Sequence, residues 1–380
     1  MIFADHAATT PVRREALEAM WPYLTGAFGN PSSRHGIGEE AARALAWARD
    51  EVAAVVGARP GDVIFTSGGT EADNLAVKGL ALANPRGRHV VVSPVEHEAV
   101  LEAADALRRL HGFEVDEVAV DATGMVTVEA LARAIRSDTT LVSVQLANNE
   151  VGTMNPIADL ARVAHEAGAL MHTDAVQAAG WLPLSLDALG VDAMSLAGHK
   201  VGAPKGTGVL VARGRLPIEP VLHGGGQERG RRSGTENVAG AVAFATALRL
   251  AESERADAAA RVSSHTARFR ELVSGAVPEA VPTGHAVDRL PGTVSYVFPG
   301  TSGEAVLLEL ERRDVVVSSG SACAAGSDEP SHVLTAMGFA PEVAQTAVRF
   351  SFGAGTSAEE VAAAAAALAD AVSAVRGIVR

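Results

Sequence analysis

Short apolar runs recur along the first two thirds of the chain, and segments of helical periodicity separate them. The runs lie at 62–66, 89–92, 141–145, 170–173, 193–196 and 208–211. A strand that is covered on both faces has such a continuous apolar pattern, whereas a strand with one wet face alternates. Residues 99–110 and 157–166 gather their apolar positions on one helix face, and Gly168 ends the second helix. This alternation predicts an α/β fold with a mostly parallel sheet, in which only the last two runs, joined by a short Gly/Pro-rich loop, form an antiparallel pair.

The pattern changes near residue 250. A charged helical segment at 248–272 leads into a Pro/Gly-rich stretch at 277–292. Strands at 294–298 and 315–318, a helix at 304–312 and a final helix from 358 complete the chain. We therefore expect a second, smaller α+β domain. We assign residues 14–250 to the large domain, and residues 1–13 together with 251–380 to the small one.

Charge and composition exclude several classes of protein. The chain has 45 acidic and 32 basic residues and a net charge of −13, which argues against general binding to nucleic acids or membranes. Arg229, Arg231 and Arg232 still form a candidate local basic patch. The single cysteine rules out a disulfide within the chain, and we find neither a signal-peptide pattern nor an apolar run of roughly 18 residues. We expect a cytoplasmic protein.

The single cysteine, Cys323, lies in an unusual setting. It is flanked on both sides by glycine, serine and alanine in the run 317–327, whereas a cysteine kept for packing usually has apolar neighbours. The thiolate is the strongest nucleophile among the side chains, so a thiol on such a loop can act as a reagent. An incidental loop cysteine is the alternative, and this segment alone does not decide between them.

Three other segments carry candidate chemistry. Gly69 and Thr70 stand where a strand ends and a helix begins, a place that suits a phosphate group. Asp174 ends a buried strand, where α/β proteins place ligands. Lys200 follows another buried strand and enters a glycine-rich turn, where partial desolvation lowers the pKa of a lysine and favours a Schiff base. Each has an ordinary alternative: a capped helix, an N-cap, and two solvated turn lysines, Lys200 and Lys205.

Taken together, the three segments match the needs of pyridoxal 5′-phosphate (PLP). This cofactor requires a lysine for its aldehyde, an acidic residue for its ring nitrogen and a cradle for its phosphate. Asp174 and Lys200 are 200 − 174 = 26 residues apart, which leaves room for one helix and one strand. The combination is far more specific than any one segment, and we expect no metal.

With further motifs, these segments resemble the cysteine desulfurases of the NifS/IscS type, which are fold-type I PLP enzymes of the class V aminotransferase superfamily. The resemblance runs nearly end to end and implies a mostly parallel, seven-stranded sheet in the large domain. The Ser-Ser-Gly-Ser-Ala-Cys sequence at 318–323 is similar to that of the group I branch. The motifs that carry the resemblance are 5–10, 28–33, 65–74, Glu96-His97, 148–152, 174–177, Gly198-His199-Lys200, 223–229, 232–235, 318–323 and Arg349-Phe350-Ser351.

The resemblance implies a role for each cofactor-binding residue. Lys200 would hold PLP as an aldimine and later move protons, and Asp174 would pair with the ring nitrogen. His97 would stack on the ring and act as an acid and base. Gln177 and Asn149 would bind near the ring oxygen and the substrate.

The remaining implied roles concern the phosphate and the partner subunit. Gly69, Thr70 and His199 would hold the phosphate. Thr235 would reach it from the other subunit of a homodimer with shared active sites.

Arg349 and Cys323 complete the implied reaction. Arg349 would bind the carboxylate of L-cysteine, a task that suits a bidentate guanidinium. Cys323 would take the sulfur, leave L-alanine and pass its persulfide to a sulfur-acceptor protein, and a Gly/Ser-rich loop would give it the necessary travel. The acceptor stays open among an iron–sulfur scaffold, a tRNA-thiolating enzyme, a DNA-sulfur system and a biosynthetic sulfur carrier.

Ala197 departs from the pattern, because the family usually has a serine hydroxyl there beside the phosphate. One hydrogen bond to a charged group contributes roughly 1.5–3 kcal/mol. We expect weaker PLP retention unless Ser195 or a water compensates.

Other functions remain open at this point. Selenocysteine lyase and cysteine-sulfinate desulfinase share these residues, while a transaminase would need no loop thiol. A catalytically silent sulfur-relay subunit is a third hypothesis, against which the full set of key residues argues.

Overall fold

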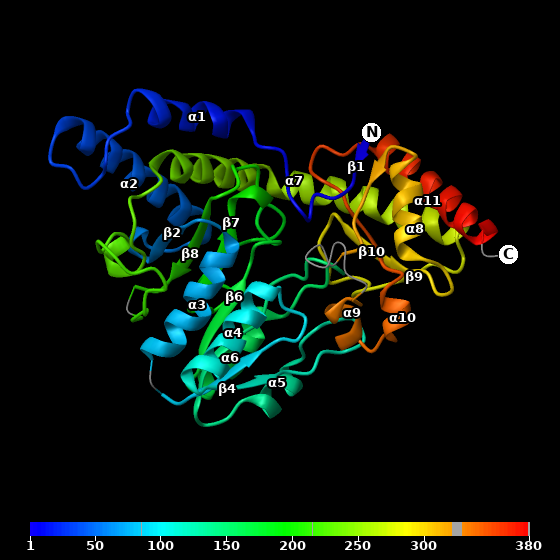
Figure 1. The fold of residues 1–380 in the computed structure, drawn as a ribbon, viewed down its shortest axis with the longest axis horizontal. Helices are drawn as coiled ribbons and strands as arrows, with labels where there is room; N and C mark the ends of the chain where they lie inside the picture. Colours follow the sequence, from blue (N-terminus) through cyan, green and yellow to red (C-terminus); the bar gives the residue numbers. More distant parts are fainter. Residues whose placement is uncertain (85, 215, 321–328, 379–380) are drawn as a thin grey trace.

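The computed structural model describes residues 1–378 apart from 85, 215 and 321–328. Its centre is a sheet of seven strands in the order β2-β8-β7-β6-β5-β3-β4 (Figure 1). The strands are β2 (Val63–Thr66), β3 (His89–Val92), β4 (Glu114–Glu117), β5 (Thr139–Ser143), β6 (Leu170–Asp174), β7 (Ala193–Ala197) and β8 (Gly208–Ala212). β8 is antiparallel to both of its neighbours, and the other pairs are parallel. The predicted fold class and the antiparallel pair are confirmed.

Small shifts separate the predicted strands from the observed ones. Asp62, predicted to begin β2, lies in the 3₁₀ turn η1 (Pro60–Asp62), and β5 begins and ends two residues earlier than expected. β4 was not predicted, because this edge strand is charged and largely exposed.

Both faces of the sheet are covered, which explains the continuous apolar runs. On β8, Leu210 and Ala212 pack into one core with α3 (Gly69–Ala83) and α4 (Glu98–His111). Val209 and Val211 pack into the opposite core. That core includes residues of α2 (Gly36–Val56), α5 (Val128–Ala134) and α6 (Ile157–Glu166). Successive residues of one strand thus face two different cores.

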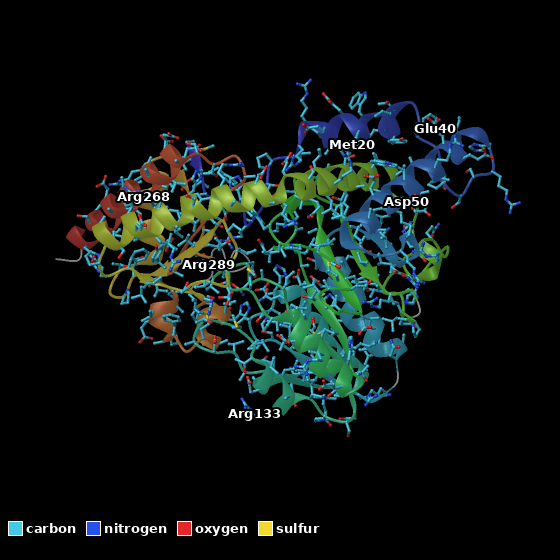
Figure 2. The ribbon with its side chains drawn as sticks, turned by 180° about the vertical axis from the view of Figure 1, so that it is seen from behind. Met20, Glu40, Asp50, Arg133, Arg268 and Arg289 are labelled. Atoms are coloured by element: carbon cyan, nitrogen blue, oxygen red, sulfur yellow. The ribbon has the colours of Figure 1, made fainter. Side chains whose placement is uncertain are left out.

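A single long helix links the two ends of the molecule. α7 (Val238–Ala276) has 39 residues and runs along the upper side of the view from the seven-stranded sheet to the C-terminal part (Figure 1). It begins ten residues before the predicted segment, because 238–248 are buried and so lack a polar face. α1 (Arg14–Thr25) packs on α7 at one end, where Met20 and Glu40 lie far from Arg268 (Figure 2). Among the residues described, no helix is both long and apolar enough to span a bilayer.

The C-terminal part has its own small sheets and core. Its strands are β9 (Val281–Pro282), β10 (Thr293–Val297), β11 (Val315–Val316) and β12 (Val348–Ser351), and its helices are α8 (Gly303–Glu311), α9 (His332–Ala336), α10 (Pro341–Ala344) and α11 (Ala358–Ile378). β1 (Ile2–Phe3) pairs with β11, so the N-terminus also lies there. Phe269 of α7 packs on Phe350 and Phe352 in this core. The division into domains at residue 250 stays a prediction.

Candidate active site

One cavity brings together most of the predicted site residues. It lies at the carboxyl ends of the parallel strands, where α/β proteins bind ligands, and its volume is about 270 Å³. The segments that follow β2, β5, β6 and β7 turn into it. Of the predicted residues, it is lined by Gly69, Thr70, His97, Asn149, Asp174, Gln177, His199, Lys200 and Arg349.

Lys200 enters this cavity from η2 (Gly198–Lys200), a 3₁₀ turn that follows β7 directly. Its ammonium donates to the carbonyl oxygens of Ala7 and Ala8. Lys205 is exposed further along the turn and does not line the cavity. Of the two lysines in this segment, Lys200 is therefore the one placed to react with a carbonyl ligand.

Asp174, the last residue of β6, supplies a buried negative charge. Its Oδ1 accepts a hydrogen bond of 2.8 Å from the amide of Val176. Burial raises the pKa of Asp174, while that hydrogen bond and the neighbouring side chains of His97 and Lys200 lower it. Such a carboxylate is stabilised by a cationic ligand, as a protonated ring nitrogen would be.

A second buried carboxylate, Asp73, lies in the same cavity and was not predicted. It is on α3, one turn after Thr70, and it is 2% exposed. Burial and the nearby charge of Asp174 raise its pKa well above the usual range, although a hydrogen bond with Ser195 acts in the opposite direction. Its Oδ1 has no hydrogen-bond partner within the described residues. The spacing from Thr70 was the only sequence signal, because it places Asp73 on the sheet-facing side of α3.

Behind Asp73, a buried chain of polar side chains runs through the sheet. The Oγ of Ser195 lies 2.9 Å from Nε2 of His172, whose Nδ1 lies 2.8 Å from Oγ of Ser143. Burial lowers the pKa of His172 to about 3, so its imidazole is neutral at physiological pH. Both hydroxyls are therefore engaged with this ring.

The turn between β2 and α3 has the form of an anion cradle. α3 is 15 residues long and begins at Gly69, so the N–H groups of its first turn are not used within the helix. A Cβ atom at Gly69 would lie 3.1 Å from Cγ2 of Val176 and 3.3 Å from Cβ of Ala197. Only glycine fits here without displacing a neighbour, and the backbone is left open to a ligand.

His199 borders the same part of the cavity as an uncharged group. Burial, assisted by the charges of Lys200 and Lys205, lowers its pKa to about 4. Its Nδ1 lies 3.2 Å from Oγ1 of Thr9, which orients the ring. A neutral imidazole here can donate a hydrogen bond to an anion without contributing a charge.

The structure shows whether Ser195 can replace the hydroxyl that is missing at Ala197. Ala197 lines the cavity, whereas Ser195 is fully buried, engaged with His172 and absent from the lining. Ser195 therefore cannot replace the missing hydroxyl.

Substituting Ala197→Ser is expected to tighten PLP binding by roughly tenfold or more, because it adds one hydrogen bond to a charged group. Titration of PLP into the unloaded protein, followed by fluorescence, measures the change. Ala193→Ser at the other end of β7 serves as a control. Equal affinities for the Ala197→Ser variant and the unsubstituted chain would show that this hydroxyl is not needed.

His97 and Gln177 are fixed by contacts with the main chain. His97 caps α4, and its Nδ1 accepts the amide hydrogen of Ala99 at 3.0 Å. The Nε2 of Gln177 donates to the carbonyl of Ala7 at 2.9 Å. Both side chains are thus held at the edge of the cavity before a ligand enters.

Arg349, on β12, brings a buried cation from the C-terminal part of the chain. It is 1% exposed, its Nη1 donates to the carbonyls of Asn149 and Gly320, and its Nη2 pairs with Asp5 at 2.6 Å. Its Nε has no partner among the described residues. A buried N–H without an acceptor is costly, and a ligand carboxylate would satisfy it.

Two predicted residues are not brought into this cavity. Thr235 lines another cavity, of about 200 Å³, together with Ser67 and Gly206. Cys323 lies outside the described residues. Gly320 precedes the residues that are not described and His332 follows them, and both line the cavity.

The candidate basic patch is largely used within the protein. Arg229 donates to the carbonyl of Val63, and Arg231 donates to the carbonyl of Gly214. Arg232 forms an ion pair with Glu71 at 2.7 Å. These contacts bind the segment around η3 (Glu228–Gly230) to β2, to the turn after β8 and to α3, which is a structural role.

Comparisons with known proteins assign the chain to a family. The aminotransferase class-V family model matches residues 2–363. Cysteine desulfurase IscS of Dictyoglomus turgidum is 43% identical over 95% of this chain and 91% of its own length, and putative cysteine desulfurase IscS 1 of Bacillus subtilis is 44% identical over 98% of both. A solved NifS-like protein superposes with a TM-score of 0.91 at 37% identity, covering 98% of this chain and 99% of that one. A structure of SspA in complex with cysteine superposes with a TM-score of 0.81 at 34% identity, over 93% and 99% of the two chains. The chain therefore belongs to the aminotransferase class-V family and, within it, to the cysteine desulfurases.

Proposed function

We propose that this protein is a PLP-dependent cysteine desulfurase, which converts L-cysteine to L-alanine and collects the sulfur as a persulfide on Cys323. The observation that carries the proposal is the meeting of Lys200, Asp174 and Arg349 in one cavity. Lys200 suits an aldehyde, Asp174 suits a cationic ring nitrogen, and the unpartnered Nε–H of Arg349 suits an amino-acid carboxylate. Lys200 and Asp174 thus match the aldehyde and the ring nitrogen of the cofactor, and Arg349 matches the carboxylate of the substrate.

The residues present fit PLP. The Gly69 turn, which a Cβ would crowd, offers amide donors for the phosphate, and His199 adds a neutral donor. Lys200 and Asp174 would hold the aldehyde carbon and the ring nitrogen. When bound, PLP supplies an electron sink that makes the Cα–H of an amino acid acidic and its carbon–sulfur bond cleavable.

The chain's own residues would then position the substrate and move protons. Arg349 would fix the carboxylate, and Lys200 would move a proton at Cα. His97, held by its bond to Ala99, would exchange a proton near the leaving sulfur. The thiol of Cys323 would take the sulfur, which balances as L-cysteine plus enzyme thiol giving L-alanine plus enzyme persulfide.

The direct test is product analysis with purified, PLP-loaded protein. With L-cysteine and a thiol reductant, we expect L-alanine and sulfide in equal amounts. Pyruvate, or no amino-acid product, would contradict the proposal. L-selenocysteine in a parallel assay decides whether selenocysteine lyase is the better description.

We also propose a homodimer with shared active sites. Large apolar side chains of α1, α2 and the segment between them are exposed, and contiguous exposed apolar surface marks interaction sites. They are Leu17, Trp21, Leu24, Phe28, Ile37 and Trp47. Thr235 lies outside the cavity of its own chain. In a dimer formed through this surface, it would reach the phosphate site of the partner subunit.

Trp21→Glu is expected to shift the protein from dimer to monomer, because Trp21 is 64% exposed and a charge there would have to be buried at the interface. Light scattering during size-exclusion chromatography measures the mass. Leu110→Glu, an exposed leucine on α4, is the matched control. If the variant with glutamate at position 21 stays a dimer, the interface lies elsewhere.

The sulfur acceptor is proposed to be another protein. As the single cysteine, Cys323 has no second thiol in the chain to resolve its persulfide. Iron–sulfur cluster assembly and tRNA thiolation are two pathways that such a donor would serve. We propose that it works in the cytoplasm, where a free thiol is kept reduced.

A further inference from the structure

The cavity contains more carboxyl groups than the proposed chemistry uses. Apart from Asp174, the carboxylates in its lining are Asp73, Glu98 and Glu150. Lys200 and Arg349 are its lysine and arginine residues within the described chain, and both already have roles in the proposed function. A substrate that brings a second negative charge, on its side chain, would therefore meet carboxylates without a matching lysine or arginine.

Among the carboxylates in the lining, Glu150 is joined to the proposed substrate anchor through the residue that precedes it in the chain. The residue before it, Asn149, accepts a 2.8 Å hydrogen bond from Arg349 at its carbonyl. The side-chain carbonyl of Asn148 accepts the amide hydrogen of Glu150 at 2.8 Å, which fixes the turn. Glu150 is 4% exposed, so its carboxylate is held in the wall of the cavity and not in solvent.

The carboxylate of Glu150 is also fixed in place. Its Oε2 accepts a 2.6 Å hydrogen bond from Oγ of Ser331. A Cβ at Gly320 would lie 3.4 Å from the same oxygen, so the main chain packs against this side of the group. Glu150 therefore cannot turn away from an incoming anion without losing the bond to Ser331.

The groups around Glu150 partly maintain its charge. Burial raises the pKa of Glu150, and the hydrogen bond from Ser331 and the charges of His332 and Arg349 oppose that rise, while Glu98 adds to it. His332 has its own partner, since its Nε2 lies 2.9 Å from the carbonyl of Glu96. This bond requires a hydrogen on Nε2, because a carbonyl oxygen only accepts.

We propose that Glu150 is a specificity-determining residue, which admits amino acids with an uncharged side chain and rejects those with an anionic one. The proposal rests on the proposed function. The thiol of cysteine has a pKa of about 8.5 and is mostly neutral at pH 7, whereas an aspartate carboxylate, with a pKa of about 3.9, is ionised. The sulfinate of L-cysteine sulfinate is likewise an anion. Rejection by a like charge is a common route to specificity.

The test compares L-cysteine with L-cysteine sulfinate, because both give L-alanine. The sulfinate reaction balances as L-cysteine sulfinate plus one proton giving L-alanine and sulfur dioxide. We would measure kcat/KM for alanine formation from each substrate in the unsubstituted protein, in Glu150→Gln, in Glu98→Gln and in Glu102→Gln. Glutamine keeps the size of the side chain and an acceptor for Ser331, and Glu102 is an exposed residue of α4 outside the cavity.

Glu150→Gln is expected to raise the kcat/KM of the sulfinate relative to that of L-cysteine by roughly tenfold or more, with no change in Glu102→Gln. Binding gives a second readout: the spectral shift of the bound cofactor on titration with L-aspartate should saturate at lower concentration in Glu150→Gln, whereas that with L-alanine should not.

Three outcomes would count against the assignment. An unchanged ratio in Glu150→Gln, with L-cysteine still turned over, would overturn it and leave the proposed function intact. A change in Glu98→Gln but not in Glu150→Gln would move selectivity to the mouth of the cavity and also overturn it. If no variant, nor the unsubstituted chain, forms alanine from L-cysteine, the proposed function itself fails.

Discussion

Lys200→Ala is expected to abolish alanine formation from L-cysteine and to remove the covalent attachment of PLP to the protein. Lys200 is the lysine of the cavity in the described chain, and its amine lies in the same enclosure as Asp174. Loss of a positioned proton-transfer group alone typically costs roughly 10²–10⁴-fold in rate. Loss of the covalent bond adds to this effect, because the cofactor then depends on the phosphate turn and Asp174 for its retention.

Borohydride reduction followed by peptide mass analysis measures that attachment. The reduced cofactor should label the peptide that contains Lys200 in the unsubstituted chain and should be absent from Lys200→Ala. Lys205→Ala is the matched control, because Lys205 is exposed five residues further along the same turn. A label retained in Lys200→Ala, or activity lost in Lys205→Ala alone, would mean that the wrong lysine has been assigned.

Cys323→Ala is expected to have the second large effect, which concerns sulfur transfer and not the binding of the cofactor. Sulfide release and persulfide formation should be lost, while PLP binding stays as in the unsubstituted protein. The reason is that Cys323 is the single cysteine, and the described residues Asp174, Gly69 and His199 form the sites proposed for the ring nitrogen and the phosphate.

Absorbance of the bound cofactor and sulfide release, measured on the same sample, distinguish the two substitutions. Lys200→Ala should lose both signals, and Cys323→Ala should lose only the second. Ser319→Ala, in the same glycine- and serine-rich segment, is the control for a general effect on that segment. Sulfide release from Cys323→Ala at the unsubstituted rate would refute the role of the thiol.

Most of the fold could be predicted, because buried strands have nearly continuous apolar sequences. The runs that became β3, β6, β7 and β8 are apolar almost throughout, since helices cover both faces of the sheet. The same reasoning failed where burial is unusual. The exposed edge strand β4 carries charged residues, and the first three turns of α7 are buried on all sides, so neither has the expected periodicity.

The site was predictable only in part, because motifs mark segments and not the side chains that surround them. The motifs indicated that Lys200, Asp174 and Arg349 belong together. They gave no sign that Asp73 would lie beside Asp174, or that Glu150 would be held by Ser331, since these contacts join α3 to β6 and the β5–β6 segment to α9. Likewise, Ser195 was a candidate to replace the hydroxyl missing at Ala197, until its partner His172 was known.

The most direct test of the central claim is to locate the transferred sulfur. PLP-loaded protein is given L-cysteine labelled with heavy sulfur, without reductant, and its peptides are analysed by mass spectrometry after alkylation. We predict one labelled sulfur atom on the peptide that contains Cys323, and L-alanine formed in equal amount. Alanine formation with an unmodified Cys323 would contradict the account.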